Sequence, residues 1–172
     1  NKMSEEMLSM RLLERSTVAP IKVNINTVAE HVRRILSDVL EKKKVELVEA
    51  FEVTECMGDE EGLIIVFRNL LENAIRASKE GDRVEWLLER KENGYLFQVK
   101  DYGIGMEQAE LEKVMDAFYR VDKGRSRNEG GVGLGLSIVD TLVKKWNGRL
   151  WIESEKNKGT IVYVELPIPP QE

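Results

Sequence analysis

Three polar residues, Asn69, Asn73 and Arg76, have the types and the spacing to bind a phosphorylated ligand. They lie four and three residues apart, so on a helix they project from one face and can converge on one ligand. The side-chain oxygen of Asn73 suits Mg²⁺, which keeps most of its waters and takes other ligands from phosphate. Arg76 offers a forked donor that neutralises phosphate charge. Taken alone, this pattern is more often a solvated helix face, so the assignment depends on the motifs that follow.

A second motif, Asp101-Tyr-Gly103-Ile-Gly105, follows a strand-like run over 95–100. A carboxylate at a strand end can accept the exocyclic amino hydrogen of adenine, whereas guanine presents an oxygen acceptor there. Gly103 and Gly105 allow backbone dihedrals and a close ligand approach that a Cβ would prevent. The motif therefore predicts a preference for ATP over GTP, although the same pattern in isolation is more often a turn.

A third motif is rich in glycine and leads directly into a helical pattern. Amide groups at a helix start, together with the helix dipole, make an anion site. A Walker loop would need lysine where Leu136 stands, and no six-residue window gives the dinucleotide-binding Gly-x-Gly-x-x-Gly after a strand. The remaining interpretation is a phosphate cradle formed by Gly131, Val132, Gly133, Leu134, Gly135 and Leu136.

The segment before this cradle, 119–131, is polar and punctuated by glycine. We expect it to be a mobile loop. Its basic residues Arg120, Lys123 and Arg125 could close over a nucleotide as a lid. The alternative is that these cations only keep a surface loop soluble.

The elements that must position these motifs follow from the apolar periodicity. Asp59 is predicted to cap a helix over 60–78 that carries both asparagines beside a buried stripe. A preceding helix, over 28–40, has Asn26 or Thr27 as its N-cap. The apolar side of that helix is formed by Val28, Val32, Ile35, Leu36 and Val39.

The remaining pattern mixes helices with hairpins. Turn signals stand at Asn93-Gly94, Asn147-Gly148 and Lys158-Gly159. Helices interleaved with hairpins favour an α/β sandwich with a mixed sheet covered on one face. Further helices are predicted over 1–15, 107–115 and 136–146, and extended segments over 18–25, 45–53, 83–90, 95–100, 149–155 and 160–166.

Composition narrows the class of protein. The 172 residues suit one domain with a short appendage, and no apolar run approaches the roughly 20 residues of a membrane span. The opening residues lack a signal peptide's apolar segment, so a cytoplasmic setting is expected. One cysteine and one histidine build neither an internal disulfide nor a zinc site. The net charge of −5 disfavours nucleic-acid binding.

Taken together, the motifs resemble the nucleotide-binding boxes of bacterial sensor histidine kinases. The matching segments run in the family's order through 21–167 and also include Phe118-Tyr119-Arg120 and Gly159-Thr160. The resemblance implies the Bergerat fold shared with gyrase, Hsp90 and mismatch-repair ATPases. That fold is a two-layer α/β sandwich whose mixed, mostly antiparallel sheet is covered on one face by helices, with a mobile ATP lid.

The resemblance also implies ATP and Mg²⁺ as cofactors and a role for each box. Asn73 would be the Mg²⁺ ligand, Asn69 a supporting polar residue, and Asp101 the adenine reader. Thr160 would support adenine through water. Catalytic roles would fall to Asn69, Arg76 and Arg120, although the family often carries lysine in place of Arg76. The nucleotide-binding residues implied are Asn69, Asn73, Arg76, Asp101, Gly103, Gly105, Tyr119, Arg120, Lys123, Arg125, the cradle 131–136 and Thr160.

The family's phosphoacceptor histidine is followed by an acidic residue and soon by proline. His31 is followed by Val32 and lies in a helical pattern, so we expect it to be structural or exposed. Residues 1–17 resemble the end of a dimerisation-domain helix, and 18–172 the catalytic domain. The implied partners are a histidine on the missing part of that dimerisation domain and a response regulator. We expect a membrane-anchored, dimeric full-length kinase, and a monomeric fragment that binds nucleotide but scarcely turns over.

Three alternatives use the same fold. An ATP hydrolase carries a glutamate four residues before the metal-binding asparagine, where this chain has Asn69, and an amide cannot act as a general base. Glu72 lies about 100° round the helix from Asn73. Anti-sigma serine kinases also have that glutamate, so Asn69 disfavours them too. A non-catalytic adenine-nucleotide-binding interaction module stays open.

Overall fold

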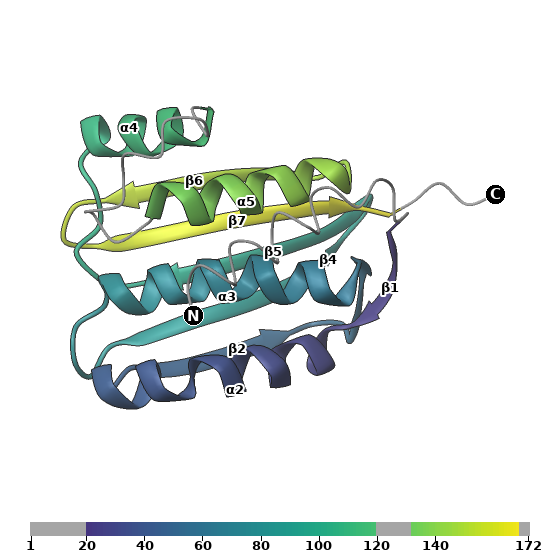
Figure 1. Cartoon of the computed structure of the whole chain (residues 1–172), viewed down its shortest axis with the longest axis horizontal. Helices are drawn as coiled ribbons and strands as arrows, with labels where there is room; N and C mark the ends of the chain where they lie inside the picture. The colour runs from purple at the N-terminus through teal and green to yellow at the C-terminus, as the bar shows by residue number, and fades with distance from the viewer. Residues whose placement is uncertain (1–19, 120–131, 169–172) are drawn as a thin grey trace.

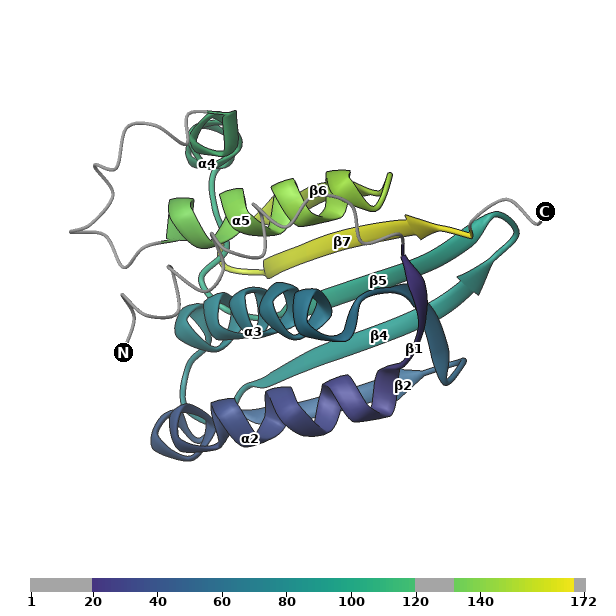
Figure 2. The ribbon, with the colours of Figure 1, turned by 45° about the vertical axis from the view of Figure 1, so that its right-hand side comes forward.

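Three long helices cover one face of a five-stranded sheet, which gives the expected two-layer α/β sandwich (Figure 1). The computed structural model describes residues 20–119 and 132–168. Turning the molecule by 45° shows the sheet behind α2, α3 and α5, with α4 beside α5 at one corner (Figure 2). The helices are α2 (Ile25–Lys43), α3 (Glu60–Ala77), α4 (Gln108–Tyr119) and α5 (Val132–Lys145).

The sheet is mixed and mostly antiparallel, as predicted. Its strand order is β2-β4-β5-β7-β6, and among the described strands only the β2–β4 pair is parallel. A separate antiparallel pair, β1 with β3, closes one end of the helical layer. The strands are β1 (Ile21–Asn24), β2 (Glu46–Phe51), β3 (Glu55–Gly58), β4 (Arg83–Lys91), β5 (Gly94–Asp101), β6 (Arg149–Glu155) and β7 (Gly159–Pro167).

The strand register brings three polar residues into one row. Asp101 of β5 is paired with Thr160 of β7, and Thr160 is paired with Ser154 of β6. Alternate residues of a strand share a face. Val99, two residues before Asp101, is buried, and Val162, two residues after Thr160, is half-buried. The row therefore faces the helical layer.

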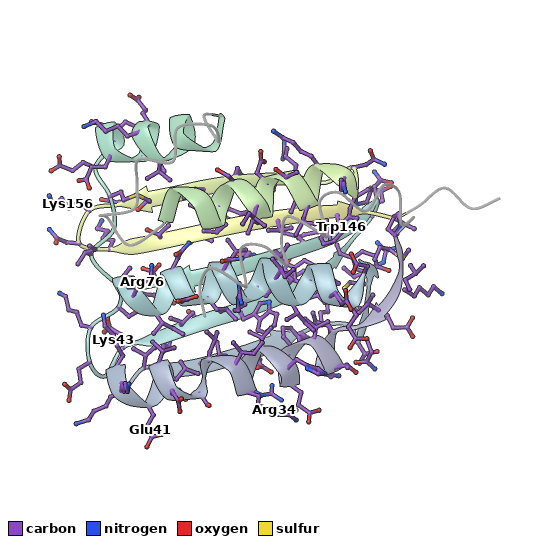
Figure 3. All side chains as sticks on the ribbon, viewed as in Figure 1. Arg34, Glu41, Lys43, Arg76, Trp146 and Lys156 are labelled. Atoms are coloured by element: carbon purple, nitrogen blue, oxygen red, sulfur yellow. The ribbon has the colours of Figure 1, made fainter. Side chains whose placement is uncertain are left out.

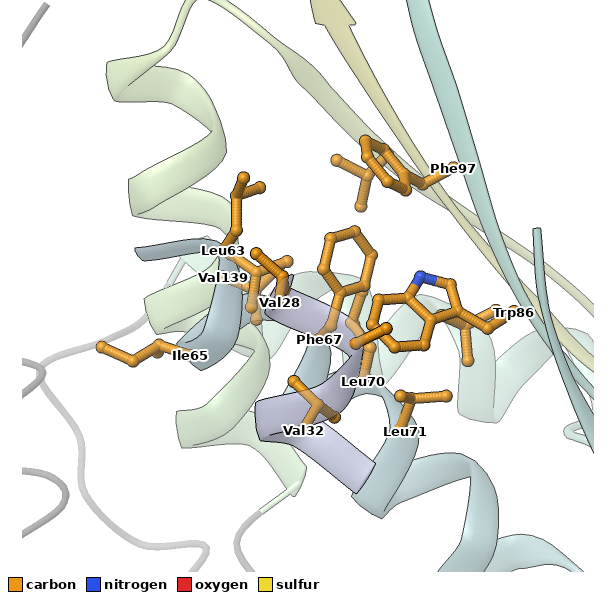
Figure 4. Close-up of a cluster of buried hydrophobic side chains, with 14 of the residues drawn as sticks. Val28, Val32, Leu63, Ile65, Phe67, Leu70, Leu71, Trp86, Phe97 and Val139 are labelled. Carbon is orange, nitrogen blue, oxygen red and sulfur yellow. The ribbon is translucent and has the colours of Figure 1, made fainter. Parts of the chain in front are cut away.

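The core is centred on Phe67 of α3, which packs between two aromatic rings of the sheet (Figure 4). Its ring centroid lies 4.8 Å from that of Trp86 and 4.6 Å from that of Phe97. The helix begins as predicted, because the Asp59 carboxylate accepts a hydrogen bond of 2.9 Å from the Gly62 N–H. Helix α3 is thus anchored by its cap and by its aromatic contact with β4 and β5.

Helix α2 differs from the prediction in its cap and in one exposed residue. Asn24, rather than Asn26 or Thr27, is the N-cap, and its side-chain oxygen accepts from the Asn26 N–H at 2.8 Å. Ile35 was placed on the buried side, but it is 50% exposed. The buried side chains of α2 form a stripe that passes beside Ile35, which therefore lies at the edge of the stripe. The stripe consists of Ile25, Val28, Ala29, Val32 and Leu36.

Several boundaries also differ. Strand β3 was not predicted, because Glu55–Gly58 shows no alternation of apolar and polar residues. Helix α4 reaches Tyr119, four residues beyond its predicted end, and α5 begins at Val132 rather than Leu136. The predicted helix over 1–15 and most of the predicted lid lie outside the described residues. No described helix is long and apolar enough to cross a membrane.

Replacing the central aromatic side chain should unfold the sandwich more easily. Phe67→Ala is expected to lower the free energy of unfolding by about 3–5 kcal/mol, because the cavity lies between two rigid rings. Urea denaturation followed by tryptophan fluorescence measures the change. Ile35→Ala, at the exposed edge of α2, is the control and should cost less than about 1 kcal/mol. Equal losses in the two variants would contradict this description of the core.

Candidate functional site

A cavity of about 200 Å³ lies between the helices and the sheet. It joins predicted residues from four separate segments: Asn73, Asp101, Thr160 and Leu136. Most of its other lining side chains are apolar, and a mainly apolar cavity with a few convergent polar groups is typical of a small-molecule site. The full lining is Leu70, Asn73, Ala74, Ala77, Val99, Asp101, Ile104, Gly105, Met106, Val114, Leu136, Ile152, Thr160 and Val162.

Asp101 is the buried acceptor of the cavity, with 5% of its surface exposed. Its carboxylate accepts a hydrogen bond of 3.0 Å from the Gly103 N–H and another from the Thr160 N–H. Burial raises the pKa of Asp101, against the lowering effect of these two bonds, and the Asp82 carboxylate adds to the rise. The two backbone donors hold the carboxylate at the end of β5, where its other lone pairs can accept from a ligand.

Tyr102, the variable residue of the Asp-x-Gly motif, is held by charged side chains from two strands. Its ring centroid lies 4.7 Å from the guanidinium carbon of Arg83 and 5.0 Å from Lys100 Nζ. Its hydroxyl donates to the Glu85 carboxylate. Cation–π contacts and this charge-assisted bond fix the backbone just after Asp101. Sequence reasoning missed this role, since only strand register brings the three charged residues to the ring.

The glycines of the same motif are needed for packing against the protein's own backbone. A Cβ on Gly103 would lie 2.0 Å from the Ala77 carbonyl oxygen. Gly105 has φ of 62°, and its Cβ would lie 2.0 Å from the Glu155 carbonyl oxygen. The prediction concerned a close approach by a ligand, and it stays a prediction. The close neighbours that the structure shows are the protein's own backbone at the end of α3 and in the β6–β7 turn.

Asn73 and Asn69 lie one turn apart on α3 and have different environments. The Asn73 side chain lines the cavity, and its buried Nδ2 has no hydrogen-bond partner among the described residues. Asn69 Nδ2 donates to the Ile65 carbonyl at 2.8 Å. Asn69 Oδ1 packs against Gly135 of α5, where an added Cβ would lie 3.2 Å from it. An unpaired buried amide costs about 1–3 kcal/mol, so Asn73 is the residue suited to a ligand.

Arg76 does not line the cavity. Its guanidinium donates to the Glu72 carboxylate at 2.9 Å, four residues earlier on α3, and its side chain is 43% exposed. Figure 3 shows it at the same end of the molecule as Lys43, whose Nζ donates to the Arg76 and Ser78 carbonyls at 2.8 and 2.7 Å. Of the three polar residues predicted to converge, the structure brings only Asn73 to the cavity.

Thr160 is tied to Ser154, a residue that sequence reasoning missed. The two side-chain oxygens lie 2.8 Å apart, and Ser154 Oγ also accepts from the Met106 N–H at 2.9 Å and donates to the Gly159 carbonyl at 3.1 Å. The available signal was the pattern of β6, in which Ser154 follows Leu150 and Ile152 at alternate positions. A small polar residue at an inward-facing position indicates a buried hydrogen bond.

The glycine-rich segment opens α5. Since α5 begins at Val132, the unpaired amides of its first turn are those of 132–135, the expected place for an anion. Gly133 and Leu134 belong to this turn by their backbone, and the Leu136 side chain is buried in the cavity wall. Tyr119 ends α4. The predicted contacts of Arg120, Lys123, Arg125 and Gly131 lie outside the described residues.

A metal at this site would need ligands beyond protein carboxylates. The described residues contain no group of three or more His, Cys, Asp or Glu side chains that could hold an ion. The side-chain oxygen of Asn73 could be one ligand of a cation that takes most of its ligands from phosphate and water, as Mg²⁺ does. Its unpartnered Nδ2 is a donor and suits a phosphate oxygen.

Comparison with known proteins decides the family. The family model described as "Histidine kinase-, DNA gyrase B-, and HSP90-like ATPase" matches residues 58–170, which include every described residue of the cavity. The chain belongs to this ATPase family. Within it, the sequence is similar to sensor kinases. The sensor protein kinase WalK of Staphylococcus saprophyticus is 40% identical over 111 residues, 63% of this chain and 18% of that protein.

Solved structures agree with the ATPase family in fold. The catalytic domain of the histidine kinase ThkA matches with a TM-score of 0.71 and 21% identity, over 87% of this chain and 96% of that one. Full-length ShkA in complex with AMPPNP matches with a TM-score of 0.75 and 23% identity, over 95% of this chain and 34% of that one. The chain thus has the fold of a sensor histidine kinase's ATP-binding domain and spans under a fifth of WalK's length.

The raised pKa of Asp101 should appear in the pH dependence of stability. A carboxyl with a raised folded-state pKa adds stability fully below its unfolded value, about 3.9, and loses it as pH rises through the folded value. Asp101→Asn does not titrate. The free energy of unfolding of Asp101→Asn, minus that of the unchanged protein, should therefore become more positive as the pH rises from about 4 to 7.

Urea denaturation over that pH range measures the difference. Asp38→Asn removes one carboxylate from the exposed side of α2 and controls for net charge. A difference for Asp101→Asn that stays flat, or falls as pH rises, would show that the carboxyl is not destabilised by burial.

Proposed function

We propose that this domain binds Mg-ATP and presents the γ-phosphoryl group to a histidine on a separate helical region of a two-component sensor kinase. The observation that carries the proposal is the joint placement of Asp101 and Asn73 on one apolar cavity. Asp101 offers a buried acceptor for a base, and Asn73 offers an unpartnered Nδ2 donor for a phosphate oxygen and a side-chain oxygen for the metal. The helix start of α5 adds amide donors for phosphate oxygens.

The comparisons support the same ligand. ShkA, which shares this fold, was solved in complex with AMPPNP, an ATP analogue. The cavity has a mainly apolar lining around the Asp101 carboxylate, so it suits the adenine end. The phosphates would then extend past Asn73 toward the start of α5, and residues 120–131 stand between α4 and α5 in the sequence.

The chain's own residues would act by positioning and charge. Asp101 orients the base, Asn73 fixes the metal-bound phosphates, and the first amides of α5 hold phosphate oxygens. A bound Mg²⁺ would supply neutralisation of phosphate charge. The acceptor imidazole nitrogen forms the new P–N bond as the P–O bond to ADP breaks, and the imidazole proton goes to solvent. A receiver domain then takes the phosphoryl group from histidine.

An ATP hydrolase of this fold would need a general base at the position where this chain has Asn69. The Asn69 amide donates to the Ile65 carbonyl and is not part of the cavity lining, so it neither carries a carboxylate nor faces the ligand. Glu72, the acid closest to Asn73 in the sequence, pairs with Arg76. These contacts favour transfer to a supplied acceptor over activation of water.

Base selection should depend on Asp101. Calorimetric titration is expected to show binding of Mg-ADP in preference to Mg-GDP, and Asp101→Asn should weaken Mg-ADP binding about tenfold or more, the size of a hydrogen bond to a charged group. Asp38→Asn should leave affinity unchanged. Equal affinity of the unchanged protein for both nucleotides would refute the role given to Asp101.

The effect of Mg²⁺ on nucleotide binding should depend on Asn73. In the unchanged protein, Mg²⁺ should strengthen ADP binding over the same titration in EDTA, and Asn73→Ala should abolish most of that gain while binding of metal-free ADP persists. Asn26→Ala, on the exposed side of α2, is the matched control. With Asn73→Ala built into the full-length kinase, acid-labile phosphohistidine should no longer form. Persistence of the full Mg²⁺ gain would remove Asn73 as the ligand.

A further inference from the structure

The row formed by Asp101, Thr160 and Ser154 connects the cavity to a hydroxyl that does not line it. Asp101 and Thr160 are cavity residues, whereas Ser154 stands one strand further, beside Thr160. Ser154 contacts Thr160 Oγ1, the Met106 N–H and the Gly159 carbonyl at 2.8, 2.9 and 3.1 Å. These three contacts determine where the proton of the Thr160 hydroxyl lies.

A serine hydroxyl has one proton to donate and two lone pairs that accept. The Met106 N–H can only donate, so it takes one lone pair of Ser154. The Gly159 carbonyl can only accept, so a contact of 3.1 Å needs the Ser154 proton. Thr160 must then donate its own proton to the second lone pair of Ser154. In the reverse arrangement, the Ser154 and Gly159 oxygens would face each other at 3.1 Å with no proton between them.

We propose that Ser154 determines base specificity, by taking the Thr160 proton so that Asp101 and Thr160 together offer only hydrogen-bond acceptors to the base. With that proton turned toward β6, Thr160 Oγ1 presents lone pairs alone. The Asp101 carboxylate also only accepts, and its Gly103 and Thr160 amide donors are already engaged. Ser154 does not contact the base and acts through Thr160, so it is a positioning residue.

An acceptor-only edge selects a base whose facing edge donates. The exocyclic amino group of adenine meets this requirement, directly or through a water that donates to Thr160. A base with a carbonyl at the same position sets lone pairs against lone pairs, and the unpaired groups lower its affinity. The inference rests on the proposed function, since it presumes that a nucleotide base occupies the cavity.

The test compares Mg-ADP with Mg-IDP, whose hypoxanthine base carries an oxygen in place of the adenine amino group and a proton on the neighbouring N1. Ser154→Ala frees the Thr160 hydroxyl to rotate and donate into the cavity. Calorimetric titration should then show the ADP-to-IDP affinity ratio fall about threefold to tenfold, the size of one neutral hydrogen bond. Thr141→Ala removes a matched hydroxyl, which donates to the Ser137 carbonyl at 2.8 Å on α5, and should leave the ratio unchanged.

A double-variant cycle shows whether Ser154 acts through Thr160. In a Thr160→Val background, Ser154→Ala should not change the ratio further, because no hydroxyl proton remains to redirect. Ser154→Cys, with a much weaker acceptor, should change the ratio in the same direction as Ser154→Ala. Thermal unfolding of every variant shows that folding is retained.

The outcomes separate the two proposals. Failure of the unchanged protein to bind Mg-ADP would overturn the proposed function, and this inference with it. If the protein binds Mg-ADP selectively but Ser154→Ala weakens ADP and IDP equally, or leaves both unchanged, only the inference is overturned. Loss of cooperative folding in both the alanine and the cysteine variants would also overturn it, since Ser154 would then serve the fold alone.

Discussion

The packing of α3 against the aromatic side chains of β4 and β5 is the contact on which the site depends. Phe67 lies between Trp86 and Phe97, and the rigid rings leave the helix little freedom to rotate or slide. Six residues further along the helix, Asn73 reaches the cavity wall. The same helix also ends against Gly103, whose missing side chain allows the loop after Asp101 to approach. Core and site therefore share one helix and cannot be varied independently.

The site is built from backbone contacts more than from side-chain charge. Asp101 is held by two amide hydrogens, and the loop that follows packs on carbonyl oxygens through glycines. On the same loop, the Tyr102 side chain is held by cation–π contacts with Arg83 and Lys100 and by a hydrogen bond to Glu85. Such a frame places an acceptor in an apolar cavity whose described lining contains no cation, and the cost of burying it is seen in its raised pKa.

Most of the fold followed from periodicity and turn chemistry, because long amphipathic helices and alternating strands carry strong local signals. Asp59 was identified as a cap, since a cap acts over a few residues. The turn predicted at Asn93-Gly94 was placed one residue late, because Glu92 and Asn93 form the turn and Gly94 begins β5. Strand β3 escaped prediction because its pairing with β1 is not local. Asp101, Asn73 and Thr160 were predicted through motifs, and all three line one cavity. Arg76 was expected at the same place, but its partner Glu72 lies on its own helix. Ser154 and Tyr102 were missed because strand register alone assigns their neighbours.

The turn between β6 and β7 does not line the cavity, but it influences which side chains stand beside it. Asn157 and Gly159 have positive φ there, and the Asn157 N–H bonds to the Ile104 carbonyl beside the cavity. This turn fixes which residue of β6 stands opposite Thr160. Adding or deleting a single residue would exchange the inward and outward sides of β6, whereas a change of two would preserve them. A change of one residue in this surface hairpin would therefore set the carboxylate of Glu153 or Glu155 beside Thr160, and a change of two would keep the inward side of β6 but still remove the Ser154 hydroxyl from that position.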